Sequence, residues 1–358
     1  MAKRVVVGMS GGVDSSVAAY LLKEQGYEVQ CIFMKNWEDE DDEFYCSSEE
    51  DYNDAVQVCE LLDLPLHSVN FSKEYRENVF KYFLAEYNSG RTPNPDVLCN
   101  KEIKFKFFMD YALKLGAEAI ATGHYARINN STDGFQLLKG IDKNKDQSYF
   151  LHLLGHKELA KTLFPIGEMT KSEVRKLAEQ MDLPNSDKKD STGICFIGER
   201  DFKAFLQQYL PTKPGNILTT EGKLVGQHDG LMYYTLGQRK GIGVGGGHGQ
   251  TEEPWYVVKK DLVKNHLIIG QGHNHPGLYN KNIRAGQLHW ILSAPSMPFD
   301  CTAKIRYRQK DQSCTVISIE NGIATIKFIE NQFAPTPGQS VVFYNGEQCL
   351  GGGIIETV

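Results

Sequence analysis

A short glycine-containing segment, Ser10–Ser15 (Ser-Gly-Gly-Val-Asp-Ser), separates an apolar run at residues 4–8 from a helix-like stretch at residues 13–25. A strand that turns through glycines into a helix leaves several backbone N–H groups without partners, and these groups point at one spot in front of the helix. The glycines let an anion approach the backbone, and Asp14 offers a carboxylate to a Mg²⁺ ion beside it. If the segment served only to cap the helix, it would need neither Gly11 nor Gly12. The segment therefore predicts a phosphate-binding loop, although not a Walker loop, because no Gly-Lys-Ser/Thr follows.

Length and composition describe an ordinary globular protein. The 358 residues exceed what one hydrophobic core usually holds, so two or three domains are expected. The 41% apolar and 23% charged residues are typical of globular chains. Because no apolar run approaches the length of a membrane span and the first residues are too short for a secretory signal, we expect a cytoplasmic protein without a membrane partner. The net charge of −6 gives no general attraction for nucleic acid.

Strand-like runs alternate with helical patterns over the first third of the chain. The runs lie at residues 5–8, 29–33, 66–71 and 119–122, and the helical patterns at residues 51–62 and 101–115. Such alternation predicts an α/β fold with a doubly wound parallel sheet. Ligands of these sheets bind beyond the carboxyl ends of the strands. Gly123, which follows the fourth run, is therefore expected at the same edge as the Ser10–Ser15 loop.

The pattern changes after about residue 205. Residues 206–279 are rich in glycine and predict a small mixed domain, whereas residues 280–358 carry short alternating runs that predict an all-β domain similar to a barrel. The expected domains are therefore 1–205, 206–279 and 280–358. Residues 241–246 match the pattern G-x-G-x-x-G, but no strand and helix frame them, so a loop is expected there rather than a dinucleotide site.

One run in the last domain carries alternating positive charge. If residues 302–307 form a strand, its period of two places Lys304, Arg306 and Arg308 on one face and Tyr307 on the other. A cationic strand face suits RNA, although such faces are often merely solvated surface.

Two of the eight cysteines have unusual neighbours. Cys99 follows two prolines and Asp96 and precedes the helical pattern at residues 101–115, so it is expected near a helix N-terminus, where the dipole favours a thiolate. Cys195 lies in a loop-like segment after two lysines. The irregular spacing without a Cys-x-x-Cys pair argues for reduced thiols and against a structural zinc site. Spacing alone leaves open whether Cys99 and Cys195 are reactive or merely packed in the interior.

Six separated motifs together resemble one family. They are Gly8–Ser15, Pro93–Asn100, Thr122–Tyr125, Lys145–Phe150, Asp190–Phe196 and Thr235–Gly241. In this order they are similar to the motifs of the bacterial tRNA-specific 2-thiouridylases, which belong to the PP-loop ATP pyrophosphatase superfamily. The similarity runs from about residue 5 to residue 356, and no motif position departs from the family pattern.

The resemblance implies a reaction. ATP, with Mg²⁺, would adenylate the C2 oxygen of the wobble uridine in tRNAs for Lys, Glu and Gln, and a cysteine persulfide would then supply sulfur. Cys99 matches the family nucleophile, Cys195 the persulfide carrier and Asp96 the acid/base group, and the two cysteines would form a transient disulfide. The family takes its sulfur from an upstream donor such as a cysteine desulfurase or a sulfur-relay protein.

The resemblance also implies three groups of binding residues. Those expected to contact ATP are Gly8, Met9, Ser10, Gly11, Gly12, Val13, Asp14, Ser15, Met34 and Gly123. Those expected around the flipped target base are Asn94, Pro95 and Asp96. Those expected to approach tRNA are His124, Lys145, Asp146, Gln147, Arg306, Tyr307 and Gln339.

Two alternative functions share the phosphate loop. A PP-loop enzyme that adenylates a small molecule and adds ammonia needs neither Cys99 nor Cys195. A non-catalytic RNA-binding or redox-sensing protein would hold a nucleotide and release no pyrophosphate.

Overall fold

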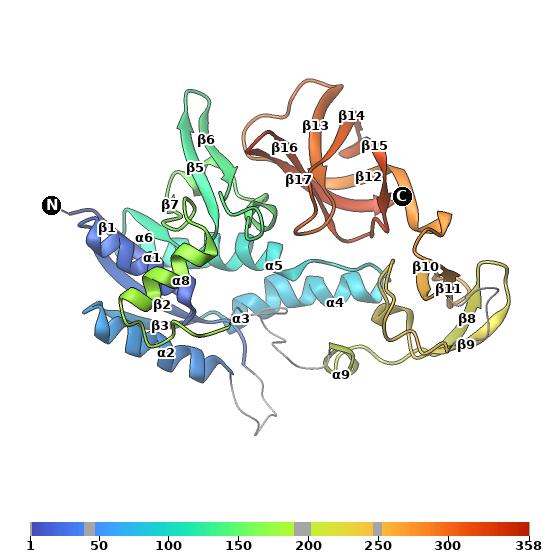
Figure 1. The fold of residues 1–358 in the computed structure, drawn as a ribbon, viewed down its shortest axis with the longest axis horizontal. Coiled ribbons are helices and arrows are strands. Elements are labelled where there is room, and N and C mark those ends of the chain that lie inside the picture. Colours follow the sequence, from blue (N-terminus) through green and yellow to red (C-terminus); the bar gives the residue numbers. More distant parts are fainter. Residues whose placement is uncertain (1, 39–46, 190–201, 246–252, 358) are drawn as a thin grey trace.

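The computed structural model describes residues 2–38, 47–189, 202–245 and 253–357. They form a parallel sheet with its helices, a small mixed sheet and a β-barrel (Figure 1). Cys195 and most of the acidic run after Glu38 lie outside the described residues. Among the helices of the described residues, none is long and apolar enough to cross a bilayer.

The N-terminal sheet is parallel and doubly wound, as predicted. Its strands, in spatial order, are β3 (Leu66–Asn70), β2 (Glu28–Lys35), β1 (Arg4–Met9), β4 (Ala119–Ala121) and β7 (Thr162–Leu163). One face is covered by α1 (Val13–Glu24), α2 (Ser47–Leu61) and α8 (Lys171–Gln180). A capping box formed by Thr170 and Glu173 begins α8.

Two long composite helices cover the other face. The first runs through α3 (Ser72–Tyr75), the π-helical segment η1 (Arg76–Phe80) and α4 (Lys81–Asn88), and the second through α5 (Pro95–Leu98), the π-helical segment η2 (Cys99–Phe108) and α6 (Met109–Lys114). The second helix begins six residues before the pattern at residues 101–115, because Asn94 caps it and Pro95 occupies its first position.

A β-hairpin that the sequence did not predict leaves the N-terminal domain. It consists of β5 (Ala126–Ser131) and β6 (Gly134–Lys139), and β6 pairs with the C-terminal strand β17 (Gln348–Thr357). The hairpin therefore joins the first domain to the barrel by sheet hydrogen bonds. A 3₁₀ turn at Ser148–Leu151 and α7 (His156–Leu159) follow the hairpin in the sequence and precede α8.

The central region is a small mixed sheet, as predicted. Its strands, in spatial order, are β10 (Trp255–Asp261), β11 (His266–Gln271), β8 (Gly215–Thr219) and β9 (Leu224–His228), preceded by α9 (Phe202–Gln207). The pairing of β11 with β8 is parallel and the others are antiparallel. Residues 241–245 form neither strand nor helix, and Ile242 is buried in the core of this domain. A dinucleotide-binding turn is therefore not formed there.

The last domain is a closed barrel. Its strands, in spatial order, are β12 (Tyr279–Trp290), β15 (Ile323–Phe333), β14 (Gln312–Glu320), β13 (Phe299–Lys304), β16 (Ser340–Asn345) and β17, and pairing of β12 with β17 closes the ring. Short 3₁₀ turns lie at Leu231–Tyr233 and Pro276–Leu278.

The prediction of a cationic strand face in the barrel is wrong. Strand β13 ends at Lys304, and the chain then bends, with Arg308 in the left-handed region at φ +63°. Lys304 is buried, and its Nζ lies 3.0 Å from the carboxylate of Asp146. Burial of a lysine is favourable only with such a partner, so Lys304 points inward rather than to solvent.

Candidate active site

The Ser10–Ser15 loop lies between β1 and α1, at the carboxyl edge of the parallel sheet. Gly11 has φ +73°, and a Cβ built there would lie 2.1 Å from the carbonyl oxygen of Asp51. Gly12 is the N-cap residue of α1 and makes no side-chain cap. The first N–H groups of α1 are therefore not covered by a cap, as an anion site requires.

Hydrogen bonds within and behind the loop fix its shape. The Ser15 hydroxyl donates to the carbonyl of Gly12 at 2.9 Å and accepts from the backbone N–H of Ser10 at 3.2 Å. The amide of Asn185 donates to the carbonyl of Gly11 at 2.9 Å. Because these bonds already order the loop, binding of an anion would cost little further conformational entropy in the loop.

Asp14 holds two partners that the sequence did not single out. The hydroxyl of Tyr125 and the ammonium of Lys171 each lie 2.7 Å from its Oδ1. Lys171 is in the first turn of α8, where the helix dipole disfavours a cation. That unfavourable placement is the one local signal that could have identified Lys171 as a site residue.

Other residues expected at the nucleotide also gather at this edge. A Cβ on Gly123 would lie 2.6 Å from the backbone of Asp14, so the segment after β4 packs directly on the start of α1. A Cβ on Gly8 would lie 3.2 Å from the Cε of Met34 at the end of β2. The structure thus brings the loop, Met34 and Gly123 to one edge, while their contact with ATP stays a prediction.

The composite helix α5–η2–α6 points its N-terminus beyond the same edge. Its last residues return to the amino end of β1, where Arg4 contacts the carbonyl of Leu115, whereas Phe108 packs near Gly8 at the carboxyl end. From Phe108 back to Cys99 the helix continues in the direction that leads away from the amino end of β1. Cys99 therefore lies beyond the carboxyl edge of the sheet, toward the Ser10–Ser15 loop.

The start of this helix carries the residues expected around the target base. Asn94 accepts a hydrogen bond from the N–H of Asp96 at 3.2 Å and so acts as the N-cap. Cys99 lies in the second turn, at the beginning of the π-helical segment, and is 2% exposed. Segments of π-helix occur frequently at functional sites. Because Cys195 lies outside the described residues, the meeting of the two thiols stays a prediction.

The N-terminal residues expected to approach tRNA are mostly engaged inside the protein. His124 is buried, its Nδ1 lies 2.8 Å from the Thr122 hydroxyl, and burial, aided by Lys104, holds its pKa well below the usual value. His124 is therefore neutral. Asp146 is buried against Lys304.

Gln147 and its neighbour Lys145 flank this buried carboxylate in the sequence. The side-chain oxygen of Gln147 accepts from the N–H of Tyr125 at 2.9 Å, so Gln147 helps to hold the residue whose hydroxyl reaches Asp14. The side chain of Lys145 is partly exposed. Contact of these residues with tRNA stays a prediction.

The barrel brings its three expected residues toward the first domain or the surface. Tyr307 packs on Phe150 with ring centroids 4.5 Å apart, and burial raises the pKa of its hydroxyl. Arg306 is exposed and lies over the ring of Phe333. The amide of Gln339 donates to the backbone just before Asn94.

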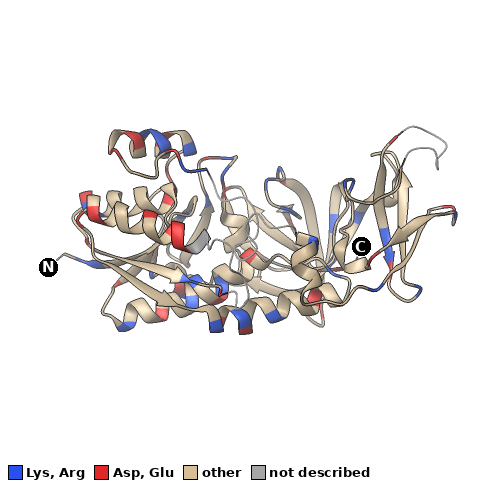
Figure 2. Cartoon of the chain, turned by 90° about the horizontal axis from the view of Figure 1, so that it is seen from below, with Lys and Arg blue, Asp and Glu red and all other residues tan. Residues whose placement is uncertain are grey.

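Along the described helices, Lys and Arg are interspersed with Asp and Glu (Figure 2). This agrees with the net charge of −6.

A doubly wound sheet that presents an anion-binding loop at the N-terminus of α1 defines a nucleotide-binding α/β domain, here joined to a barrel. Family models match all three parts of the chain: the tRNA methyl transferase HUP domain at residues 3–199, the tRNA methyl transferase PRC-barrel domain at residues 203–271 and the aminomethyltransferase beta-barrel domain at residues 280–355.

Full-length relatives define the family more closely. The chain is 58% identical over 356 residues to the tRNA-specific 2-thiouridylase MnmA of Idiomarina loihiensis, covering 99% of this chain and 96% of the relative. It is 59% identical over 355 residues to the protein of the same name from Pseudomonas entomophila, covering 99% and 95%. The chain belongs to the tRNA-specific 2-thiouridylase family. Among solved structures, a U34-tRNA thiolase from Methanococcus maripaludis is 21% identical with a TM-score of 0.36 over 54% of this chain and 61% of that chain, a similarity too low to inform the site.

Proposed function

We propose that this protein uses ATP to replace the C2 oxygen of the wobble uridine with sulfur in tRNAs for Lys, Glu and Gln. The observation that carries the proposal is that the uncapped start of α1 and the start of the helix bearing Asp96 and Cys99 both lie at the carboxyl edge of one sheet. The near-complete overlap with relatives named as 2-thiouridylases supports the same reaction.

The first step is adenylation. A uracil carbonyl oxygen is a poor leaving group. It attacks the α-phosphorus of ATP, pyrophosphate leaves, and the base then carries an adenylate whose later departure from C2 is as AMP. The N–H groups at the start of α1 stabilise the charge on the phosphates, and Lys171 balances the carboxylate of Asp14. Asp14 offers an oxygen ligand of the kind that Mg²⁺ prefers, and a bound Mg²⁺ supplies further positive charge against phosphate oxygens.

The second step is sulfur transfer. The terminal sulfur of a persulfide on Cys195 attacks C2 and AMP leaves with the original oxygen. The thiolate of Cys99 then attacks the inner sulfur of Cys195, which breaks the S–S bond, leaves sulfur on the base and forms a Cys99–Cys195 disulfide. A dithiol reductant returns the two thiols before the next turnover. The base must leave its stack for this chemistry, because the reacting atom belongs to the base itself.

The cellular setting follows from this chemistry. Reduction of the disulfide in every cycle requires a reducing compartment, which favours the cytoplasm. The persulfide is supplied by a cysteine desulfurase or a sulfur-relay protein that reaches Cys195.

The test is mass spectrometry of tRNA nucleosides after incubation with ATP, Mg²⁺ and a small-molecule persulfide. We expect 2-thiouridine with the wild type and with Cys301→Ser, and none with Cys195→Ala or Cys99→Ser. Cys99→Ser should still release pyrophosphate in the presence of tRNA.

Two outcomes would replace this function with another. Pyrophosphate release that needs no tRNA and survives both active-site cysteine substitutions would indicate an amidating enzyme. Binding of ATP and tRNA without any pyrophosphate release would indicate a non-catalytic protein.

A further inference from the structure

After Ser89, the C-cap of α4, the four residues Gly90–Pro93 lead to Asn94 and so to the helix start that carries Asp96 and Cys99. We call this segment the strap. In Figure 1 it lies between α4 and α5, below the barrel, and α4 runs from the first domain toward the central one. Contacts from both other domains converge on it.

The barrel holds the second half of the strap through its backbone. The N–H of Thr92 donates to the carbonyl of Pro337 at 2.9 Å, and the Gln339 amide donates to the carbonyls of Thr92 at 2.8 Å and Pro93 at 3.3 Å. Gly338 has φ +94°, and a Cβ there would lie 2.9 Å from the backbone of Thr92. The barrel loop therefore approaches the strap as closely as neighbouring strands approach each other.

Arg91 fastens the strap to the last strand of the barrel. Its guanidinium binds the carboxylates of Glu86 and Glu356 and donates to the carbonyl of Ile355 at 3.3 Å. These bonds join the end of α4 to β17. Together with the contacts of Thr92 and Pro93, they tie the strap to the barrel.

The central domain contacts the strap at Gly90 and Thr92. The ammonium of Lys260, on β10, donates to the carbonyl of Gly90 at 3.0 Å, and the hydroxyls of Thr235 and Thr92 lie 3.3 Å apart. Gly90 has φ +73°, and a Cβ there would lie 2.5 Å from the side chain of Leu262.

The position of Lys260 beside Gly90 is unfavourable for stability. Burial lowers the pKa of its ammonium to about 8, and within the part of the chain that the structure describes no carboxylate pairs with it. The side chain of Lys260 is partly buried, and a cation withdrawn from water against a carbonyl costs stability that an apolar side chain would not cost. The contact with Gly90 is therefore better explained by function than by stability.

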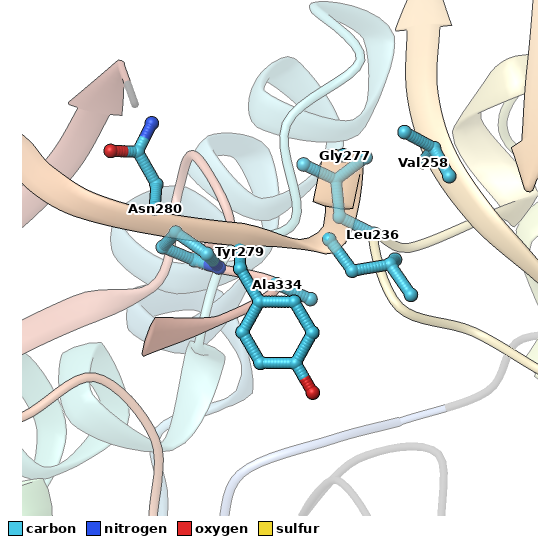
Figure 3. Close-up of a pocket in the computed structure, with 8 residues that line it drawn as sticks. Leu236, Val258, Gly277, Tyr279, Asn280 and Ala334 are labelled. Carbon is cyan, nitrogen blue, oxygen red and sulfur yellow. The ribbon is translucent and has the colours of Figure 1, made fainter. Parts of the chain in front are cut away.

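The interface between the central domain and the barrel contains a pocket of about 60 Å³ (Figure 3). It is lined by Leu236 and Val258 from one side, by Tyr279 and Asn280 from the other, and by Ala334 and Pro335 from the segment that leads to the barrel loop on the strap. Apolar contacts also join the two domains, since the rings of Tyr256 and Phe333 pack edge-on with their centroids 6.3 Å apart, and the polar contacts with the strap add to them.

We infer that Lys260 is a positioning residue, which together with Gln339 fixes the strap so that the following helix start presents Asp96 and Cys99 correctly to the nucleotide loop. The inference rests on the proposed function for its kinetic readout. A misplacement of about 1 Å in such a group can cost roughly 100-fold in rate. Lys260 acts through the carbonyl of Gly90 and touches no reacting atom.

The test compares Lys260→Met with Lys260→Arg and with Lys259→Met, an exposed neighbour on the same strand. We expect Lys260→Met to lower kcat for 2-thiouridine formation at least tenfold, with the KM for ATP, the Kd for tRNA and its salt dependence unchanged. Lys260→Arg should recover most of kcat, because it can still donate to Gly90, and Lys259→Met should match the wild type. Amide hydrogen exchange over residues 94–99 should speed up in Lys260→Met only.

Three results would overturn the inference. One is wild-type kcat and exchange in Lys260→Met. Another is a weaker Kd for tRNA with a shallower salt dependence, which would make Lys260 a phosphate contact. The third is a lowered melting temperature with kcat per folded molecule unchanged, which would make it merely structural.

If Lys260→Met does not fold, Gln339→Met tests the strap from the barrel side and must show the same loss of kcat and the same faster exchange. If the wild type makes no 2-thiouridine, the proposed function fails, while the exchange over residues 94–99 still decides the role of Lys260.

Discussion

The ammonium of Lys171 lies 2.7 Å from Oδ1 of Asp14, in front of the first turn of α1. Both side chains are partly buried, with 13% of Lys171 and 31% of Asp14 exposed. A carboxylate at this place repels a phosphate that the helix N-terminus attracts. The pair removes that conflict, because the positive charge of Lys171 balances the negative charge of Asp14.

Removal of the Lys171 charge should therefore weaken the use of ATP. We expect Lys171→Met to lower kcat/KM for ATP by about 10- to 100-fold, as loss of a preorganised electrostatic group does at active sites. The measurement is tRNA-dependent pyrophosphate release. Lys176→Met, an exposed position on the same helix, is the control and should behave as the wild type. Equal kinetics in the two variants would show that Lys171 serves α8 and not the nucleotide.

Substitution of Asn94 should separate its cap from its expected contact with the target base. Asn94→Ala removes the acceptor of the Asp96 N–H and should destabilise the protein by about 1 kcal/mol. Asn94→Ser restores an acceptor and should recover the melting temperature, but it lacks the amide and should not recover 2-thiouridine formation. Recovery of both properties in Asn94→Ser would reduce Asn94 to a cap.

Local patterns predict the parts of this fold that depend on neighbours in the sequence. Apolar runs and glycines predict the parallel sheet and the loop before α1, because a strand, a turn and a helix need only short-range information. The hairpin of β5 and β6 escaped prediction, since its place depends on pairing with β17, far along the chain. The predicted strand at residues 302–307 is present only as far as Lys304, and its cationic face is absent because the partner of Lys304 is Asp146, which no local pattern reveals.

The candidate site divides in the same way. Motifs predict the Ser10–Ser15 loop and the segment around Cys99, because each is contiguous. Lys171, Tyr125 and Lys260 were missed, since each acts on a distant partner across a domain or helix boundary. Their chemistry becomes visible only when the three domains are assembled.

Cys301 and Cys314 should form a disulfide under oxidation. They lie opposite each other on β13 and β14, with their sulfurs 3.6 Å apart. Hydrogen peroxide should oxidise the two thiols, with loss of two hydrogen atoms from the protein and formation of water. The hydrogen bond with Cys301, followed by burial, raises the pKa of the Cys314 thiol, so attack should begin from Cys301.

The closed loop is short, and on chain-entropy grounds the disulfide should stabilise the barrel by about 3 kcal/mol. Peptide mapping after peroxide treatment and a thermal melt check the two statements. Cys301→Ser should show neither the linked peptides nor the higher melting temperature. An unlinked pair in the oxidised wild type would mean that the strands cannot bring the sulfurs closer.

His152 should make the protein sensitive to acid. It is buried, its Nδ1 donates to the carbonyl of Tyr149 at 2.8 Å, and a Cβ on Gly352 of β17 would lie 2.7 Å from its ring. Burial, opposed by the bond to Tyr149, lowers its pKa to about 4. The unfolded chain takes up this proton near pH 6.5 and the folded protein only near pH 4. The unfolded state therefore binds more protons between these values, and stability falls as the pH falls through that window.

Between pH 7 and pH 5 the loss of stability should be about 2 kcal/mol. Urea unfolding at the two pH values measures it, and in His152→Gln the difference between them should shrink by that amount. A variant that keeps the full pH dependence of the wild type would assign the acid sensitivity to other groups.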